Sequence, residues 1–284
     1  MRIPNFNTTE GSRLYRSTVG RQIAPRVAEL LLDHIQRQLG EVAQSQCDIL
    51  ELGCGPGTLT IPLAQAFPFS RITATDPSEA MIELAREAAG ARGLQNLTFA
   101  AVEAGKLGWA PSSFDVVVCN LAFPFFRRPY QTLRQVFKVV KPGGSVHFSV
   151  PGEHTWEEFL VIAAGVLGSA WSVAKPFLQK IQQAQQLPGA LLHAGFRDLS
   201  EEHFRIPFSF PGSFEVLAFF AELFRLLDYA PHASRDILAD AIDRQYPQGF
   251  QMHYEALVLA ARRPALPPRH AALSARRPRA PESR

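Results

Sequence analysis

The chain has 284 residues, 46% of them hydrophobic, and a formal net charge of +3. This length is sufficient for one large domain with appendages. Residues 264–284 hold five arginines and one acid, so this segment carries +4 and residues 1–263 carry about −1. A nucleic-acid-binding protein needs a basic face on its folded body, so the charge distribution argues against that class.

The cysteines and apolar runs exclude two further classes. There are three cysteines (Cys47, Cys54 and Cys119) and no CxxC pair, so neither a disulfide framework nor a metal site is predicted. The first residues lack an apolar signal core. The longest uncharged run, 159–174, has 16 residues and is shorter than the ~18 that indicate a membrane span. We therefore expect a cytoplasmic protein without stable membrane insertion.

The first half of the chain alternates between helical and strand patterns. Residues 22–39 carry apolar side chains every three or four positions, which predicts an amphipathic helix that ends at Gly40. We expect segment 1–44 to be helical and to serve as a lid. The patterns then predict strands at 48–52, 71–75, 97–102, 114–119 and 145–150, helices at 58–67, 79–91 and 129–140, and a turn at 141–144. Strands alternating with helices predict a doubly wound, mostly parallel α/β sheet.

The pattern changes after Pro151. Helices are predicted at 156–174, 179–194, 214–227 and near 234–245, and strands at 197–208 and 252–261, which brings the sheet to seven strands. The main domain is expected to span 45–263, with cap helices at about 155–194 and 212–246 that either pack on the sheet or line an apolar acceptor site. Residues 264–284 are rich in Pro, Ala and Arg and are expected to be disordered.

A glycine-rich turn follows the first predicted strand. Gly53, Gly55 and Gly57 stand at alternate positions in Glu51-Leu-Gly-Cys-Gly-Pro-Gly57. Glycine permits a sharp turn and a close approach of a ligand to the backbone. The amides at the start of the next helix would face that ligand. The turn therefore predicts a cofactor site.

Acids stand at three strand ends, where a doubly wound sheet binds its ligands. Glu51, Asp76 and Glu103 occupy the ends of the first three strands, with no lysine or arginine among them. This arrangement favours a cationic ligand or one rich in hydroxyl and amino donors. Asp76 is suitably placed for ribose hydroxyls, which leaves NAD open. However, Thr58 stands where the dinucleotide fingerprint has its third glycine, and Glu51 would repel a pyrophosphate.

These motifs, together with Asp76-Pro-Ser, Glu103-Ala, the strand 114–119 with Asn120-Leu-Ala and Lys141-Pro-Gly-Gly, resemble class I S-adenosylmethionine-dependent methyltransferases. The closest group is that of small-molecule enzymes of the quinone and biotin pathways. The resemblance covers roughly residues 45–150. It implies a Rossmann-like methyltransferase fold with a helical cap after the fifth strand and around the sixth, and S-adenosyl-L-methionine as the cofactor.

The resemblance also implies a role for each motif residue. Glu51 and Gly53 would lie near the methionine amino group, and Gly55 and Gly57 would pass beneath the cofactor. Asp76 would bind the ribose. The remaining positions would contact the adenine (Pro77, Glu103 and Ala104) and the methyl-transfer face (Asn120 and Leu121).

Methyl transfer from a sulfonium mainly requires alignment of the acceptor with the methyl group. A hydroxyl acceptor would also benefit from a base. The candidate catalytic residues are His154 and Tyr15, with Glu153 a further option. Many relatives carry a polar residue after the fourth strand, but this chain has Phe123-Pro-Phe-Phe126 followed by Arg127 and Arg128, which favours an apolar acceptor pocket.

The sequence therefore predicts an enzyme that methylates oxygen or carbon of a small, largely apolar acceptor. The alternatives are methylation of a carboxylate on a carrier-bound acyl group, in which Arg127 or Arg128 would matter, and a module that binds the cofactor without methyl transfer. An NAD-dependent oxidoreductase is the remaining rival.

Overall fold

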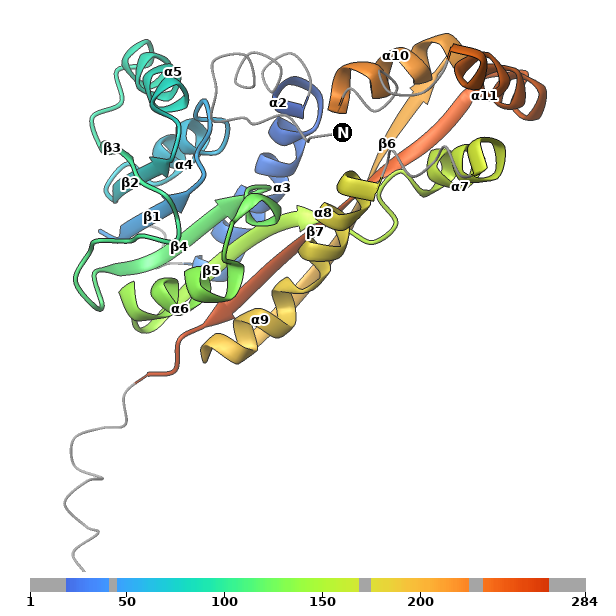
Figure 1. The fold of residues 1–284 in the computed structure, drawn as a ribbon. Coiled ribbons are helices and arrows are strands. Elements are labelled where there is room, and N and C mark those ends of the chain that lie inside the picture. The colour runs from blue at the N-terminus through green and yellow to red at the C-terminus, as the bar shows by residue number, and fades with distance from the viewer. Residues whose placement is uncertain (1–18, 41–44, 169–174, 225–231, 266–284) are drawn as a thin grey trace, which may run out of the picture.

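A seven-stranded sheet forms the centre of the protein. The computed structural model describes residues 19–40, 45–168, 175–224 and 232–265. The strand order is β3-β2-β1-β4-β5-β7-β6, and β7 runs antiparallel to the other six strands. The strands are β1 (Asp48–Leu52), β2 (Arg71–Asp76), β3 (Leu97–Ala101), β4 (Phe114–Asn120), β5 (Val140–Pro151), β6 (Arg197–Phe210) and β7 (Phe250–Arg262). The predicted Rossmann-like fold is confirmed (Figure 1).

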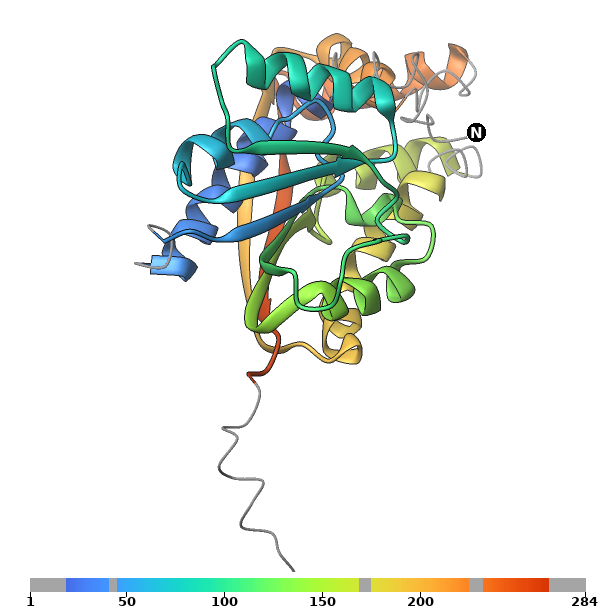
Figure 2. The ribbon, with the colours of Figure 1, turned by 90° about the vertical axis from the view of Figure 1, so that its left-hand side faces the viewer.

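Helices cover both faces of this sheet. The helices that precede β4 in the chain are α2 (Val19–Gln22), α3 (Ala24–Leu39), α4 (Thr60–Ala66) and α5 (Glu79–Gly90). Helices α3 and α4 pack on one face through a shared apolar cluster that includes Ile49 and Val118. Figure 2 shows α5 lying over β2 and β3. Residues 24–39 of the predicted lid thus cover the sheet, while residues 1–18, including Tyr15, lie outside the described residues.

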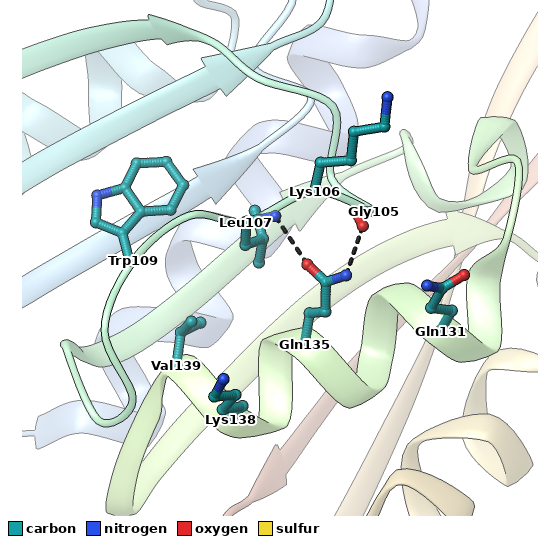
Figure 3. Close-up of a pocket in the computed structure, with 8 residues that line it drawn as sticks. All are labelled: Gly105, Lys106, Leu107, Trp109, Gln131, Gln135, Lys138 and Val139. Carbon is teal, nitrogen blue, oxygen red and sulfur yellow. Dashed lines mark hydrogen bonds between the residues drawn. The ribbon is translucent and has the colours of Figure 1, made fainter.

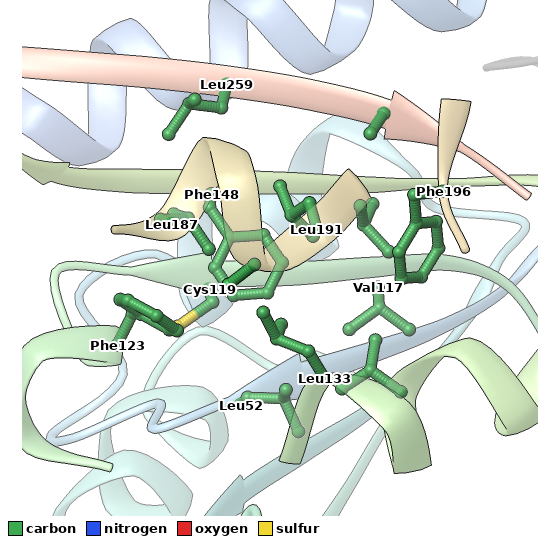
Figure 4. Close-up of a cluster of buried hydrophobic side chains, with 14 of the residues drawn as sticks. Leu52, Val117, Cys119, Phe123, Leu133, Phe148, Leu187, Leu191, Phe196 and Leu259 are labelled. Carbon is green, nitrogen blue, oxygen red and sulfur yellow. The ribbon is translucent and has the colours of Figure 1, made fainter. Parts of the chain in front are cut away.

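The opposite face is covered by η2 (Phe123–Phe125), α6 (Pro129–Val139), α8 (Lys175–Gln185) and α9 (Leu187–Ala194). Leu133 of α6 and Leu191 of α9 are fully buried in a cluster with Val117 of β4 and Phe148 of β5 (Figure 4). Helices α8 and α9, which the sequence assigns to the cap, therefore help to cover the sheet. The prediction of one helix over 179–194 is also wrong, because α9 begins beside Pro188, whose missing amide hydrogen suits a helix start.

The remaining helices form a second apolar core over the ends of β6 and β7. They are α7 (Glu157–Leu167), α10 (Ser213–Phe224) and α11 (His232–Gln245). Trp156 lies fully buried against Phe219 and Phe220, and the Phe159 and Phe220 rings stack at 3.8 Å. Packing is thus the observed role of these aromatic side chains. Trp156 itself has φ 62° and precedes α7, although the sequence predicted it inside the helix.

The predicted turn at 141–144 is also wrong. Residues 141–144 belong to β5, with a register shift against β4 after the Phe114–Val140 pair. The amide of Gly143 donates to the Arg263 carbonyl, and the Arg263 amide donates to the Gly144 carbonyl. A lysine, a proline and two glycines favour a turn locally, but pairing with the distant end of β7 satisfies this backbone in an extended form.

Candidate cofactor site

The glycine turn lies between the ends of β1 and β2. Gly53, Gly55 and Gly57 have φ values of 69°, 53° and 90°, a region that costs other residues free energy. A Cβ added at Gly53 would overlap the Cβ of Ala122, which follows β4. The turn is thus shaped by the left-handed backbone that all three glycines adopt without strain and by close contact with the segment after β4.

Asp76 holds this turn through its carboxylate. Its Oδ2 accepts a hydrogen bond of 3.0 Å from the Gly55 amide, and its Oδ1 accepts one of 2.9 Å from the Ser78 amide. The Ser78 hydroxyl separately accepts from the Met81 amide and caps α5. The cap is therefore formed by Ser78, while Asp76 connects β2 to the glycine turn.

Glu51 lies beside Asp76 in a fully buried position. Its Oε2 accepts a hydrogen bond of 2.6 Å from the Thr60 hydroxyl of α4. Burial raises the pKa of Glu51 to about 7, and the negative charge of Asp76 adds to this rise. Burial also raises the pKa of Asp76, against the opposing hydrogen bonds from Ser78 and Gly55.

Neither carboxylate has a cationic partner among the residues that the structure describes. No lysine, arginine or histidine within the described ranges forms an ion pair with Glu51 or Asp76. Buried charges without a partner are costly and mark functional sites. A ligand with positive charge would lower both pKa values and stabilise both carboxylates. The residues at the ends of β1 and β2 therefore fit the sulfonium and ammonium groups of S-adenosylmethionine.

The predicted adenine contacts lie at the end of β3. The Val102 amide donates to the Asp76 carbonyl, which places Glu103 and Ala104 directly after the Asp76 strand end. The Glu103 carboxylate is about one-third exposed and lies 3.8 Å from the Lys106 ammonium, whereas Ala104 is buried. Pro77 is exposed beside Asp76. The structure thus brings Pro77, Glu103 and Ala104 to the same edge of the sheet as Asp76.

Gln135 of α6 fixes the loop beyond Ala104. Its side-chain oxygen accepts from the Leu107 amide at 2.8 Å, and its side-chain nitrogen donates to the Gly105 carbonyl at 2.6 Å (Figure 3). The sequence did not indicate this residue. The loop and α6 enclose a cavity of about 530 Å³, lined by Gly105, Lys106, Leu107, Trp109, Gln131, Gln135, Lys138 and Val139. None of the predicted site residues lines this cavity.

Asn120 and Leu121 lie at the end of β4. The Asn120 side chain accepts from the Ser149 hydroxyl at 2.7 Å and donates to the Ala24 carbonyl at 3.4 Å. Leu121 has φ 56°, and its amide donates to both oxygens of Ser149. Ser149 was not identified from the sequence, because a serine within an apolar strand carries no motif. These contacts hold the Asn120 amide group against β5 and α3.

The catalytic candidate His154 is not brought into contact with these residues. Its side chain is half exposed and lies 3.1 Å from Glu157, and its amide donates to the Glu255 carboxylate. Glu153 is exposed, and Tyr15 lies outside the described ranges. The proposed catalytic roles of His154 and Tyr15 therefore stay predictions.

The comparisons with known proteins agree with this geometry. Residues 49–144 match the methyltransferase domain family. This part of the chain is therefore a class I S-adenosylmethionine-dependent methyltransferase domain. S-adenosylmethionine is the cofactor of this class.

Among curated relatives, the chain is 33% identical over 136 residues to a malonyl-[acyl-carrier protein] O-methyltransferase of Bacillus cereus. That match covers 48% of each protein, and the chain spans about half the length of the curated relatives it matches.

Solved structures share the fold. The phosphoethanolamine N-methyltransferase 2 of Haemonchus contortus matches with a TM-score of 0.58 and 19% identity, over 92% of this chain and 58% of that protein. The [4+2]-cyclase SpnF matches with a TM-score of 0.56 and 22% identity, over 86% of this chain and 82% of that protein. One of these two proteins is named as a methyltransferase and the other as a cyclase, so the similarity shows the fold alone.

None of the helices in the described ranges combines the length and apolar character needed to cross a bilayer.

Proposed function

We propose that this protein transfers a methyl group from S-adenosylmethionine to a carboxylate on a carrier-bound acyl group. The observation that supports methyl transfer is the pair of buried acids, Glu51 and Asp76, at the glycine turn, which have no cationic partner in the described part of the chain. When bound, the cofactor supplies an electrophilic methyl group on a sulfonium. The chain would contribute binding and alignment, which account for most of the catalysis in such a reaction.

Two observations favour a carboxylate acceptor over the predicted apolar one. The curated relatives are named for methylation of a malonyl group on an acyl-carrier protein. A carboxylate is also ionised at neutral pH and needs no general base. The His154 side chain contacts Glu157, which agrees with a reaction that needs no general base. The chain spans about half the length of these relatives, so the acceptor assignment requires a direct test.

The second candidate is the small, largely apolar acceptor. It is favoured by the position of Leu121, which belongs to the same apolar cluster as Trp156 and Phe220 of the cap. An apolar molecule entering beside Leu121 would meet this cluster. Residues of the cap would then determine acceptor choice.

The two candidates are distinguished by the chemistry of the product. We would incubate the protein with methyl-labelled S-adenosylmethionine and either malonyl-carrier protein or a cell extract. A carboxyl methyl ester releases its label as methanol in mild base, whereas an ether or carbon-linked methyl group does not. Base-stable label in an extracted small molecule would support the apolar acceptor instead. Label in neither fraction would support a module that binds the cofactor without methyl transfer.

Asp76→Asn provides the matched control, because its weaker cofactor binding should reduce labelling in either case. A thermal-shift comparison of S-adenosylhomocysteine with NAD tests the cofactor independently, since a ligand stabilises the fold that binds it. Stabilisation by NAD alone would contradict the proposal. A cytoplasmic location is part of the same proposal, because Cys47, Cys54 and Cys119 are free buried thiols, as is usual in reducing compartments.

A further inference from the structure

A second concave surface lies between η2 and α8, outside the cofactor site. It encloses about 480 Å³ and is lined by Phe125, Phe126, Arg127, Pro129, Gln179, Lys180, Gln182, Gln183 and Gln186. We call it the glutamine groove. It begins three residues after Ala122, which packs against Gly53 of the glycine turn. Gln185, also on α8, donates to the carbonyl of Pro151 at the end of β5. The groove therefore lies beside the carboxyl ends of β4 and β5.

Two cations and no acids line the groove. Arg127 is exposed at one side. Lys180 is half-buried, and burial lowers the pKa of its ammonium group. That ammonium donates to the Pro124 carbonyl at 2.6 Å and to Gln183 at 3.4 Å, and it lies 5.5 Å from the centre of the Phe125 ring. Within the described parts of the chain, no carboxylate forms an ion pair with Arg127 or Lys180. The groove therefore attracts an anion.

The rest of the groove offers amide groups. Gln179, Gln182 and Gln183 follow one another at the three- and four-residue spacing that places side chains on one face of α8, and Gln186 follows at the start of α9. Gln183 donates to the Phe126 carbonyl, and Gln186 lies 3.5 Å from the Tyr130 hydroxyl. Gln179 and Gln182 are exposed. Side-chain amides both donate and accept hydrogen bonds, so a row of them suits an extended chain that itself contains amides.

We propose that the glutamine groove binds the phosphate-bearing, amide-containing arm through which the acyl group is attached as a thioester. Arg127 and Lys180 would contact the phosphate, and the glutamines would contact the amides. This inference rests on the proposed carboxylate acceptor. The same arm occurs on acyl-carrier proteins and in coenzyme A, and the groove would recognise what they share.

Kinetics with matched substrates test this role. Malonyl-carrier protein and malonyl-coenzyme A contain the phosphate, and malonyl-pantetheine lacks it. Arg127→Gln and Lys180→Gln should each raise KM for both phosphate-bearing substrates about tenfold, because each removes a charge-assisted contact, with kcat little changed. KM for malonyl-pantetheine should not change. Arg128→Gln is the control, since Arg128 carries the same charge but does not line the groove.

Gln182→Glu is a second variant, chosen because it should change the charge of the groove without disturbing the fold. Gln182 is exposed on α8, where glutamate is equally compatible with a helix. A carboxylate there should repel the phosphate and raise KM to a similar degree. Unchanged KM in Arg127→Gln, Lys180→Gln and Gln182→Glu would overturn the proposal. A larger effect on carrier protein than on coenzyme A would identify the carrier-bound arm as the principal ligand.

Calorimetry with unacylated coenzyme A separates this inference from the proposed function. Binding to the native protein that weakens in Arg127→Gln supports the groove even if no methyl ester forms. Ester formation by a protein whose coenzyme A binding is identical in Arg127→Gln and the native form supports the function and contradicts the groove.

Discussion

The Thr60 hydroxyl donates a hydrogen bond of 2.6 Å to the Glu51 carboxylate, and both side chains are buried. This pair joins the end of β1 to the first turn of α4, across the glycine turn. It holds an acid in a position where no lysine, arginine or histidine of the described ranges forms an ion pair with it. The cost of burying that acid becomes measurable when the ligand is absent.

Glu51→Gln should stabilise the ligand-free protein at high pH. Glutamine keeps an acceptor for Thr60 but removes the charge. Because the folded pKa is raised from 4.5 to about 7, ionisation of Glu51 destabilises the fold increasingly between these pH values. The full cost is present above pH 7, at about 3 kcal/mol. Denaturant unfolding should show that gain at pH 8 and little gain at pH 5, while calorimetry shows weaker cofactor binding. Equal stability of both proteins at pH 8 would contradict the buried charge.

Asp76→Asn should weaken cofactor binding by about tenfold or more, because it removes a charged acceptor at the glycine turn. Ser78→Ala is the matched control. It removes only the cap of α5 and should cost about 1 kcal/mol of stability with no change in affinity. Calorimetry with S-adenosylhomocysteine and thermal unfolding measure the two effects separately. Equal loss of affinity in both variants would show that Asp76 acts only through the helix start.

Gly53→Ala should destabilise the protein through two separable causes. Its φ of 69° costs an alanine about 1–2 kcal/mol, and overlap with Ala122 adds about 1–3 kcal/mol. Adding Ala122→Gly should remove the second cost and leave the first. A double-mutant cycle by denaturant unfolding measures the coupling. Strict additivity of the two changes would show that the side chains do not meet.

Glu158→Gln should loosen the attachment of α7 to β7. Burial acts to raise the pKa of Glu158, but hydrogen bonds from the side chain and amide of His253 outweigh it, so the net pKa is lowered. A lowered folded pKa contributes stability above the unfolded value of 4.5, and this is lost as pH falls through the folded pKa. The difference in Tm between the native protein and Glu158→Gln should therefore shrink below about pH 4.5. Glu157→Gln is the control, since Glu157 is exposed beside His154.

Local patterns were sufficient to predict the strands and the glycine turn. Buried strands such as 114–120 are apolar almost throughout, and the N-cap at Ser78 has its own signature. The predictions that were wrong concern segments whose backbone conformation depends on more than the local pattern. Residues 141–144 look like a turn until β7 pairs with them, and Pro188 divides one apolar run into two helices.

The sequence by itself determined the parallel sheet, the glycine turn and the acids at the strand ends, because these depend on periodicity, on glycine at positive φ and on residues adjacent in the chain. Only the tertiary structure decided that Thr60 and Ser149 support Glu51 and Asn120. It likewise separated Arg127, which lines the glutamine groove, from Arg128, which does not. Such contacts join residues on different strands and helices, and their free energies depend on burial and distance, which no local pattern encodes.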